Sequence, residues 1–461
     1  MALQLAGKRV TVIGLARSGV AACKLLAAHG AEVRGSDARP AEALAADLAD
    51  LRQRGVVLET GGHTPASFRD ADLVVISPGV PTGLPLLASA RERGIPVWGE
   101  VELASRLTEA RFLAVTGTNG KSTTTCLVGA MLQAAGIPSV VAGNIGTALS
   151  EVVPALTRDH WVVAELSSFQ LETIVSFRPR IALLLNLAPD HLDRYADAED
   201  YYRAKARIFE NQGPEDAAVL NAEDPLVPVY ARDLRARPLF FSRTRAVEEG
   251  ACLREGQIVL RRAGQAAAVC PAGAVRILGL HNLENGLAAA AAAAAAGAPP
   301  AAIGAALREF PGLPHRLEPV GERNGVRFIN DSKGTNVGAV QKSLESFARG
   351  VILIAGGKDK GGDFAPLRPL LESRVKRLLL LGEAAGTIRE QLRGACPMET
   401  VATLEEAVRR GAALAEAGDT VLLSPACASF DMFRDFEQRG DVFRRAVQEL
   451  LGRRGGERAN G

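Results

Sequence analysis

The sequence predicts an α/β protein made of three domains that contain parallel sheets. Short apolar runs that end in glycine-containing turns alternate with helix-like stretches, which is typical of βαβ units. This pattern restarts near residues 108 and 312, and a chain of 461 residues is too long for one hydrophobic core. We therefore predict domains over residues 1–106, 107–312 and 313–461.

The composition argues against several classes of protein. The 54 Lys and Arg residues nearly balance the 52 Asp and Glu residues, so no strong field favours nucleic acid or a membrane surface. The six cysteines form no CxxC pair, which favours free thiols in a reducing cytoplasm over disulfides or a zinc site. No signal-peptide pattern or uncharged stretch of membrane length is present. We expect a cytoplasmic protein with a disordered tail over residues 452–461.

The N-terminal domain begins like a dinucleotide-binding unit. A strand over Lys8–Gly14 runs into the turn Gly14–Gly19, and a helix follows to about His29. The next strand, Ala31–Gly35, leads to Asp37, eighteen residues after the end of that turn. This is near the usual spacing for an acid that binds ribose, and it predicts a Rossmann-like domain.

Two interpretations of this turn stay open. Ala16 replaces the second glycine of the motif, where the backbone must approach a pyrophosphate closely. A nucleotide site and a plain Rossmann-like turn are both consistent with this pattern. A further strand, Leu73–Ser77, directs another loop to the same edge of the sheet.

The central domain opens with a loop suited to phosphate. Phe112–Val115 is a short apolar strand, the loop after it carries Gly117 and Gly120, and Lys121-Ser122 begins a helix. Glycines let backbone N–H groups converge on phosphate oxygens, and a helix N-terminus favours anions. The lysine would contact the β- and γ-phosphates, and the serine hydroxyl would bind Mg²⁺. The residues assigned to ATP in this loop are Gly117, Thr118, Asn119, Gly120, Lys121, Ser122 and Thr123.

The spacing of this loop is not a strict Walker A motif, because Val115 stands where the first glycine belongs. A glycine-rich turn with an incidental lysine is the alternative. Strand, glycines, Lys-Ser pair and helix nevertheless occur in the required order. This order favours a nucleoside triphosphate site on a central domain of the P-loop ATPase type with a parallel sheet.

Three more polar residues of the central domain are candidates for the same site, and two of them follow the ends of strands. The strand 161–165 ends in Glu165, the loop after the next strand contains His191, and the helix 201–209 carries Lys205. Taken singly, they could be a surface carboxylate, a turn histidine and a solvated lysine. A Mg²⁺–triphosphate complex needs hard oxygen ligands, which the loop serine and Glu165 would supply, with His191 as a nitrogen ligand.

The C-terminal domain repeats the α/β pattern over about 150 residues, a normal domain size. Apolar strands over Arg327–Asn330, Val351–Ala355, Leu378–Leu381 and Thr420–Leu423 each run into a polar loop. Functional side chains of such sheets gather at the carboxyl ends of the strands, so these loops are candidate binding segments. We expect a second Rossmann-like α/β fold here.

Together these motifs resemble the Mur ligase family, the amide-bond-forming enzymes of bacterial peptidoglycan synthesis. The likeness covers nearly the whole chain and keeps the order of the motifs. The P-loop and the Asp190-His191 pair are common to the family, whereas residues 165–172 and 424–431 are typical of the branch that uses D-glutamate. The matching stretches are 116–123, 143–146, 165–172, 190–194, 204–207, 281–282 with Asn285, 313–318, 330–336 and 424–431.

The resemblance implies an ATP-dependent ligase that adds D-glutamate to UDP-N-acetylmuramoyl-L-alanine in peptidoglycan synthesis, and so serves cell shape and division. The reaction would pass through an acyl phosphate and a tetrahedral intermediate, and would release ADP and phosphate. Mg²⁺, ATP as co-substrate and a carbamylated Lys205 are implied. The expected partners are these small molecules, with no nucleic acid, no membrane insertion and a monomeric state.

The resemblance also distributes the site residues over the three domains. Ser18 and Asp37 would contact the UDP part of the substrate, and Asn144 its muramoyl or pyrophosphate region. The implied catalytic residues are Lys121, Glu165, His191 and Lys205, and the implied metal ligands are Ser122, Glu165, His191 and Lys205. The ATP residues outside the loop are Asn282, Asn285, Arg316 and Asp331. The residues implied to frame D-glutamate are Thr335, Lys360, Ser429 and Phe436, and His191 is also implied to contact substrate.

Other functions stay open at this point. Within the family, the chain could add L-alanine or act as a folylpolyglutamate synthase, and an assay of amino acids and acceptors distinguishes these. An NAD(P)-dependent oxidoreductase built on residues 14–37 would change the absorbance of a nicotinamide. A non-catalytic nucleotide sensor would not turn over ATP with an acceptor.

Overall fold

The computed structural model describes residues 3–44, 48–191, 194–359 and 361–452, so residues 453–461 of the tail predicted over 452–461 lie outside the described residues. The chain divides into two compact units. One contains Met1–Val275 and Glu284–Glu309, and the other contains Arg276–Leu283 and Phe310–Gly461.

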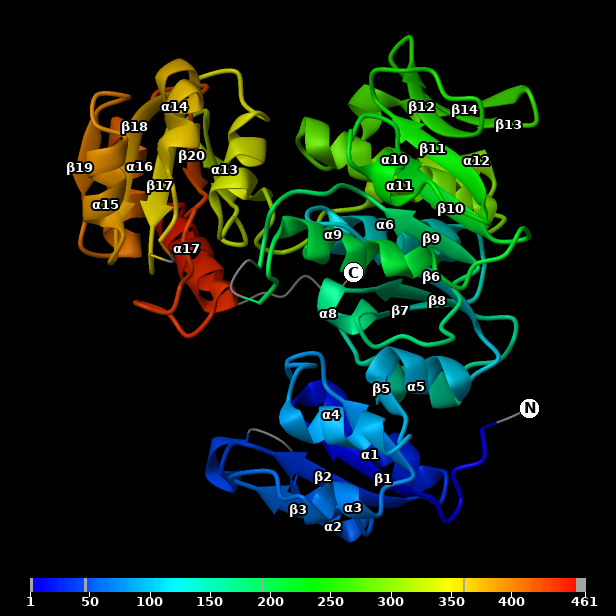
Figure 1. Cartoon of the computed structure of the whole chain (residues 1–461). Helices are drawn as coiled ribbons and strands as arrows, with labels where there is room; N and C mark the ends of the chain where they lie inside the picture. Colours follow the sequence, from blue (N-terminus) through cyan, green and yellow to red (C-terminus); the bar gives the residue numbers. More distant parts are fainter. Residues whose placement is uncertain (1–2, 45–47, 192–193, 360, 453–461) are drawn as a thin grey trace. The chain divides into compact units, whose positions relative to one another are not determined.

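Within the described residues three sheets form the framework, drawn in Figure 1 in blue, in cyan to green, and in yellow to red. Two of these sheets belong to the first unit and one belongs to the second. This α/β architecture agrees with the predicted fold. The domain boundaries after residues 106 and 312 stay predictions.

The N-terminal sheet has five parallel strands in the order β3-β2-β1-β4-β5. Strand β1 is central and four of its five residues are buried, as its apolar sequence predicts. The order reverses beside β1, so the turn after this strand opens at the switch point of the sheet. The elements are β1 Arg9–Ile13, α1 Arg17–Ala28, β2 Glu32–Asp37, α2 Leu48–Gln53, β3 Val57–Thr60, α3 Ala66–Arg69, β4 Leu73–Ile76, α4 Pro85–Glu92, β5 Val97–Gly99 and α5 Glu100–Arg106.

The central sheet has nine strands in the order β14-β13-β12-β11-β10-β9-β6-β8-β7. The strands from β7 to β12 are parallel, as predicted. In chain order, the helices and strands from β6 to β11 are β6 Arg111–Thr116, α6 Lys121–Ala134, β7 Ser139–Gly143, α7 Leu149–Val152, β8 Trp161–Glu165, α8 Ser168–Leu171, β9 Ile181–Leu184, α9 Ala198–Ala206, β10 Ala217–Asn221, α10 Val227–Tyr230 and β11 Arg237–Ser242.

An antiparallel edge, which the sequence analysis did not anticipate, completes the central sheet. Strands β12 (Gly250–Arg254), β13 (Gln257–Arg262) and β14 (Gln265–Pro271) pair antiparallel through two-residue turns. Both residues of each turn have positive φ: 49° and 74° in Glu255-Gly256, and 50° and 77° in Ala263-Gly264. This backbone matches the right-handed twist of a hairpin, so such short links impose antiparallel pairing.

The C-terminal sheet has six strands in the order β15-β16-β20-β17-β18-β19. All neighbouring pairs are parallel except β15 with β16. Helices α11 Leu280–Ala295 and α12 Pro300–Glu309 precede this sheet in the chain, and residues 284–309 belong to the first unit. The elements of the C-terminal sheet region are β15 Glu318–Arg323, β16 Val326–Asn330, α13 Val337–Leu344, β17 Val351–Gly356, α14 Arg368–Arg374, β18 Val375–Leu381, α15 Ala385–Gln391, β19 Met398–Thr400, α16 Leu404–Leu414, β20 Thr420–Leu423 and α17 Phe436–Leu450.

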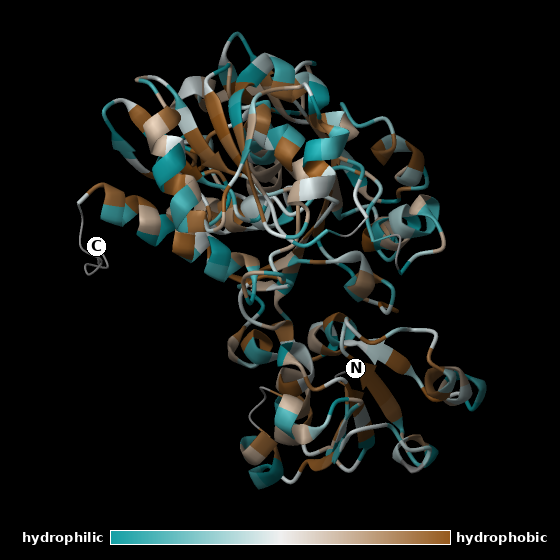
Figure 2. Ribbon diagram, turned by 90° about the vertical axis from the view of Figure 1, so that its left-hand side faces the viewer, coloured by the Kyte–Doolittle hydropathy of each residue, from teal (hydrophilic) through white to brown (hydrophobic). Residues whose placement is uncertain are grey.

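Apolar side chains are concentrated on the strands. Figure 2 shows brown along the strands inside the sheets and teal on many helix faces that point outward. The alanine-rich part of α11, residues 287–293, is buried, because small side chains let neighbouring elements approach closely. All six cysteines are free thiols, as expected. In the described part of the chain, no helix combines the length and the apolar character needed to cross a membrane.

Candidate functional site

The phosphate loop lies between β6 and α6, and β6 is an inner strand of the nine-stranded sheet, flanked by β9 and β8. Helix α6 begins at Lys121, as predicted, and Gly120 before it has a φ of 85°. A Cβ atom on Gly120 would lie 2.2 Å from Oδ1 of Asn285. Glycine is therefore required both by the left-handed backbone and by the close approach of Asn285.

The side chain of Lys121 folds over this loop. Its Nζ donates to the carbonyls of Gly117 and Thr118, both at 2.9 Å. The sequence analysis missed Asn186, which braces the same loop: its Oδ1 accepts from Asn119 N at 2.8 Å, and its Nδ2 donates to Asn119 O at 3.1 Å. A polar residue that follows an apolar strand is the signal that could have identified it.

Glu165 at the end of β8 is the buried carboxylate of this site, with 2% of its surface exposed. Its Oε1 accepts from Asn144 Nδ2 at 2.7 Å. Its Oε2 is buried and has no hydrogen-bond partner among the described residues. A buried carboxylate oxygen without a donor is costly, and carboxylate oxygens are preferred ligands of Mg²⁺. The residues present therefore fit a magnesium ion, and Asn144 lies where it orients the carboxylate.

Lys205 on α9 is also buried, with 1% of its surface exposed, so it is not a solvated helix lysine. Its Nζ donates to Gly117 O at 2.8 Å and lies 4.6 Å from the centre of the Tyr201 ring. Burial lowers the pKa of this amine well below its usual value, and the charge of Lys121 lowers the pKa further. The structure thus brings Lys205 to the predicted phosphate loop.

His191 is much more exposed than Glu165 and Lys205, with 46% of its side chain accessible. Its ring meets the Phe169 ring edge-to-face at 4.9 Å and lies 5.9 Å from the Tyr201 ring. Its Nε2 is 3.8 Å from Oδ2 of Asp190. His191 and Lys205 therefore border the same aromatic ring.

Asp37 braces the glycine turn of the N-terminal domain. Its Oδ2 accepts from Leu15 N at 2.7 Å, and Arg39 donates to both carboxylate oxygens at 2.9 to 3.1 Å. Burial opposes ionisation, but these hydrogen bonds outweigh it and lower the pKa of Asp37 to about 2. Ser18, in the first turn of α1, is half-buried.

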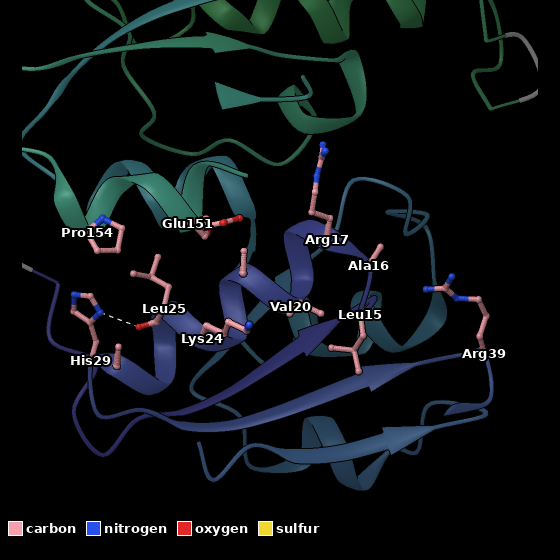
Figure 3. A pocket seen from close by; sticks show the side chains of 13 residues that line it. Leu15, Ala16, Arg17, Val20, Lys24, Leu25, His29, Arg39, Glu151 and Pro154 are labelled. Atoms are coloured by element: carbon pink, nitrogen blue, oxygen red, sulfur yellow. Dashed lines mark hydrogen bonds between the residues drawn. The ribbon is translucent and has the colours of Figure 1, made fainter. Parts of the chain in front are cut away.

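A cavity of about 660 Å³ begins at this turn and follows one face of α1. Figure 3 shows Leu15, Ala16 and Arg39 at one end, and His29 and Pro154 at the other. The glycine turn therefore borders a cleft and is not closed by packing. The cavity is lined by Leu15, Ala16, Arg17, Val20, Ala21, Lys24, Leu25, Ala28, His29, Arg39, Ser150, Glu151 and Pro154.

In the second unit, Asp331 joins the loops that follow β16 and β20. Its Oδ2 accepts from Ser343 Oγ at 2.6 Å and from Ser424 Oγ at 2.7 Å, and its Oδ1 accepts from Leu317 N at 3.2 Å. Burial raises the pKa of Asp331 to about 6, although these hydrogen bonds favour the ionised form. The positive charge of Arg316 also favours the ionised carboxylate and so lowers its pKa.

Two of the residues predicted to frame D-glutamate lie on loops of this unit. Thr335 is half-buried and Ser429 is buried, and they follow β16 and β20. Phe436 is the first residue of α17, and Nζ of Lys333 lies 3.7 Å from its ring centre. Lys360 lies outside the described residues.

Two predicted ATP residues fall in different units although both lie on α11. Asn285 belongs to the first unit and reaches Gly120 of the phosphate loop. Asn282 belongs to the second unit, where its Nδ2 donates to Leu278 O at 2.6 Å.

The sequence analysis also missed Arg439, which is 2% exposed on α17. It donates to the carbonyls of Ser332, Cys427 and Ala428, and so ties together two of the predicted loops. A helix arginine is normally solvated, so the sequence carries no signal for this role.

Three family models match the chain. They are Mur ligase MurD-like, N-terminal domain, over residues 8–99; Mur ligase middle domain, over residues 115–293; and Mur ligase, glutamate ligase domain, over residues 315–427. Each coincides with one of the three sheets.

Relatives match over nearly their whole length. The UDP-N-acetylmuramoylalanine--D-glutamate ligase of Pelobacter propionicus is 48% identical over 448 residues, which are 97% of this chain and 100% of the relative. The protein of the same name from Acidobacterium capsulatum is 47% identical over 447 residues, with 96% and 97% covered.

Solved structures share the fold at low identity. A pseudomurein peptide ligase type C from Methanothermus fervidus aligns with a TM-score of 0.62 at 19% identity, covering 96% of this chain and 100% of its own. UDP-N-acetylmuramate-alanine ligase from Thermotoga maritima aligns with a TM-score of 0.58 at 21% identity, covering 97% and 100%. With the full-length relatives, the matching sheets and the phosphate loop in agreement, the chain belongs to the Mur ligase family.

Proposed function

We propose that this chain is an ATP-dependent ligase that joins D-glutamate to UDP-N-acetylmuramoyl-L-alanine in peptidoglycan precursor synthesis. Its similarity over 97% of its length to a ligase of that name is the observation that carries the proposal. The phosphate loop, Glu165 and Lys205 support it, because they bring two lysine amines and a buried carboxylate with an unpaired oxygen to one site.

The chemistry needs activation, because a carboxylate is a poor electrophile. The alanyl carboxylate takes the γ-phosphoryl group of ATP, which forms an acyl phosphate and releases ADP. The amine of D-glutamate then attacks the acyl carbon, and the tetrahedral intermediate expels phosphate to leave an amide. Transfer between two anions needs positive charge around both, and Lys121 supplies it beside the loop carbonyls.

Ser122, Glu165 and His191 are the residues that would hold Mg²⁺. When bound, this ion neutralises charge on the phosphates and on the accepting carboxylate. Asn144 orients Glu165, since it occupies one carboxylate oxygen and leaves the other for the metal. Arg316 and Asp331 would contact ATP, and Thr335, Ser429 and Phe436 would bind D-glutamate.

The finer proposal for Lys205 is a carbamate. The ammonium first loses one proton, and the neutral amine then adds to carbon dioxide, so an N–C bond forms and a second proton leaves. A side chain with one positive charge thereby becomes one with a negative charge. Burial favours the neutral amine that this reaction needs. An ammonium in that place would repel Mg²⁺, whereas a carbamate offers two oxygens to it.

We assign one task to each predicted domain: UDP binding to residues 1–106, ATP binding to residues 107–312 and amino-acid binding to residues 313–461. We propose that the protein acts as a monomer in the cytoplasm and takes only small-molecule partners.

The test is an incubation with ATP, Mg²⁺, UDP-N-acetylmuramoyl-L-alanine and a panel of amino acids. ADP and phosphate should form in step with the D-glutamyl product. AMP and pyrophosphate would instead indicate an adenylate and would contradict the mechanism. Turnover with L-alanine, or with a folate acceptor, would favour the other ligases of this family.

A further inference from the structure

Within the first unit, the side chain of Arg194 links the N-terminal domain to the loop that carries His191. Its guanidinium donates to Pro78 O at 3.0 Å and to Val80 O at 3.5 Å, both in the loop after β4. It also pairs with Glu172 at 3.3 Å. The two side chains are only 21% and 16% exposed, so solvent screens this pair less than an exposed one.

The carboxylate of Glu172 accepts hydrogen bonds from the loop after β4 and from the segment that follows His191. Besides Arg194, its carboxylate accepts from Tyr195 OH at 2.5 Å and from Thr82 Oγ1 at 3.3 Å. Thr82 belongs to the loop after β4, and Tyr195 follows the His191 segment. One carboxylate thus joins two segments that lie more than a hundred residues apart in the sequence.

The loop after β4 in turn packs on the glycine turn proposed to hold UDP. Ser77 Oγ donates to Gly14 O at 2.7 Å. A Cβ atom on Gly14 would lie 2.9 Å from Cγ2 of Val80, so the two segments touch without space for a side chain. Any displacement of the turn is therefore transmitted to this loop.

At the other end, the conformation of His191 depends on its neighbours. Its φ is +55°, a left-handed conformation that is unfavourable for a residue with a Cβ atom. Arg194 N and Tyr195 N donate to His191 O at 3.0 and 3.1 Å and hold this turn. The Phe169 ring, which the histidine meets edge-to-face, also carries the Arg194 guanidinium at 3.9 Å from its centre.

We propose that Arg194, together with Glu172, is a positioning residue that couples occupation of the UDP turn to the placement of His191. The contacts run from Gly14 through residues 77–82 to Arg194, and from there to His191. A planar guanidinium can bind two carbonyls, a carboxylate and a ring face at once, which an ammonium cannot. This inference rests on the proposed function for the identity of the nucleotide.

Hydrogen–deuterium exchange with UDP as the probe tests the coupling directly. UDP should slow exchange of the peptide that contains His191 in the wild type. In Arg194→Gln this remote protection should vanish, while the affinity for UDP changes less than about threefold because the turn itself is intact. Arg203→Gln, an exposed α9 arginine paired with Glu199, is the matched control and should behave like the wild type.

Kinetics supply the second readout. Arg194→Lys and Glu172→Gln should each lower kcat by about 10- to 100-fold, with the KM for ATP nearly unchanged, because a misplaced catalytic group slows chemistry and not ATP binding. The double variant should lose little more than either single variant, since both act on one coupling.

Equal protection of the His191 peptide in Arg194→Gln and the wild type would overturn the proposal, and so would an unchanged kcat or a failure of UDP to bind. A wild type that binds UDP with remote protection but forms no D-glutamyl product would contradict the proposed function and leave the coupling supported. The two failures are therefore distinguishable.

Discussion

At the scale of single residues, burial decides which chemistry a charged side chain can perform. Lys205 and Glu165 are 1% and 2% exposed. Lys205 donates to Gly117 O of the phosphate loop, and Glu165 accepts from Asn144 Nδ2. Lys121, by contrast, folds onto two loop carbonyls that a phosphate can replace as partners. These differences lead to different expectations for substitution.

Replacing Lys121 with Ala should lower kcat by about 10³-fold, because the charge that stabilises the transferred phosphoryl group is removed. The melting temperature should change little, since the hydrogen bonds from its Nζ to Gly117 O and Thr118 O lie within the loop and not in the hydrophobic core. ADP release and thermal denaturation measure the two effects. Lys8→Ala, at an exposed lysine, is the control, and an active Lys121→Ala enzyme would refute the phosphate role.

Replacing Lys205 with Arg should abolish most activity, about 10²-fold or more, because arginine stays positive and cannot form a carbamate. Carbon-13 NMR after exchange with labelled carbon dioxide should show a carbamate signal in the wild type and none in the variant. A fully active variant would end the hypothesis.

At the scale of elements, Glu102 on α5 fastens the segment that follows α8. Its carboxylate accepts from the N–H groups of Val175, Ser176 and Phe177, from Ser176 Oγ and from Arg106. Burial would raise the pKa of Glu102, but these hydrogen bonds outweigh it and lower the pKa below 4.5. The contact holds α5, the helix between the first two sheets, against the central domain.

Replacing Glu102 with Gln should reduce the free energy of unfolding at pH 7 by about 2 kcal/mol, because charged hydrogen bonds to buried amides are lost. The wild-type carboxylate stabilises the fold above its unfolded pKa of 4.5, and this contribution disappears as the pH falls through the lowered folded value. The difference between the two proteins should therefore shrink in acid.

Urea titrations at pH 7 and pH 4 check this expectation. Both tryptophans, Trp98 and Trp161, lie in the first unit, so their fluorescence reports its unfolding. Glu109→Gln, at a carboxylate that is 73% exposed, is the matched control. A constant difference between the variant and the wild type at both pH values would contradict the assigned cause.

At the scale of the whole molecule, we propose that loops of the second unit select the amino acid. Ser429 and Thr335 offer hydroxyls on loops braced by Asp331 and Arg439. A buried polar site rejects an amino acid that leaves its groups unpaired, by up to about 10⁴-fold. D-glutamate should accordingly be used far better than D-alanine, as competition between the two substrates measures. Comparable use of L-alanine would contradict the proposed specificity.

Much of this framework was predictable because its signals are local. The strand at residues 112–115, the turn at Gly120 and the helix start at Lys121 follow from apolar runs and glycine positions, and the structure has them there. The antiparallel edge at β12–β14 was missed, because the turns Glu255-Gly256 and Ala263-Gly264 lack the stronger Asn-Gly signal.

The sequence by itself determined the fold class, the phosphate loop and the family, since each depends on residues close together or on motifs in a fixed order. It left open whether Lys205 was solvated, and it carried no sign that Arg194 reaches Pro78. Only the tertiary structure decided these points. Burial and pairing depend on side chains that folding brings together from distant segments, and no local pattern encodes the distance between them.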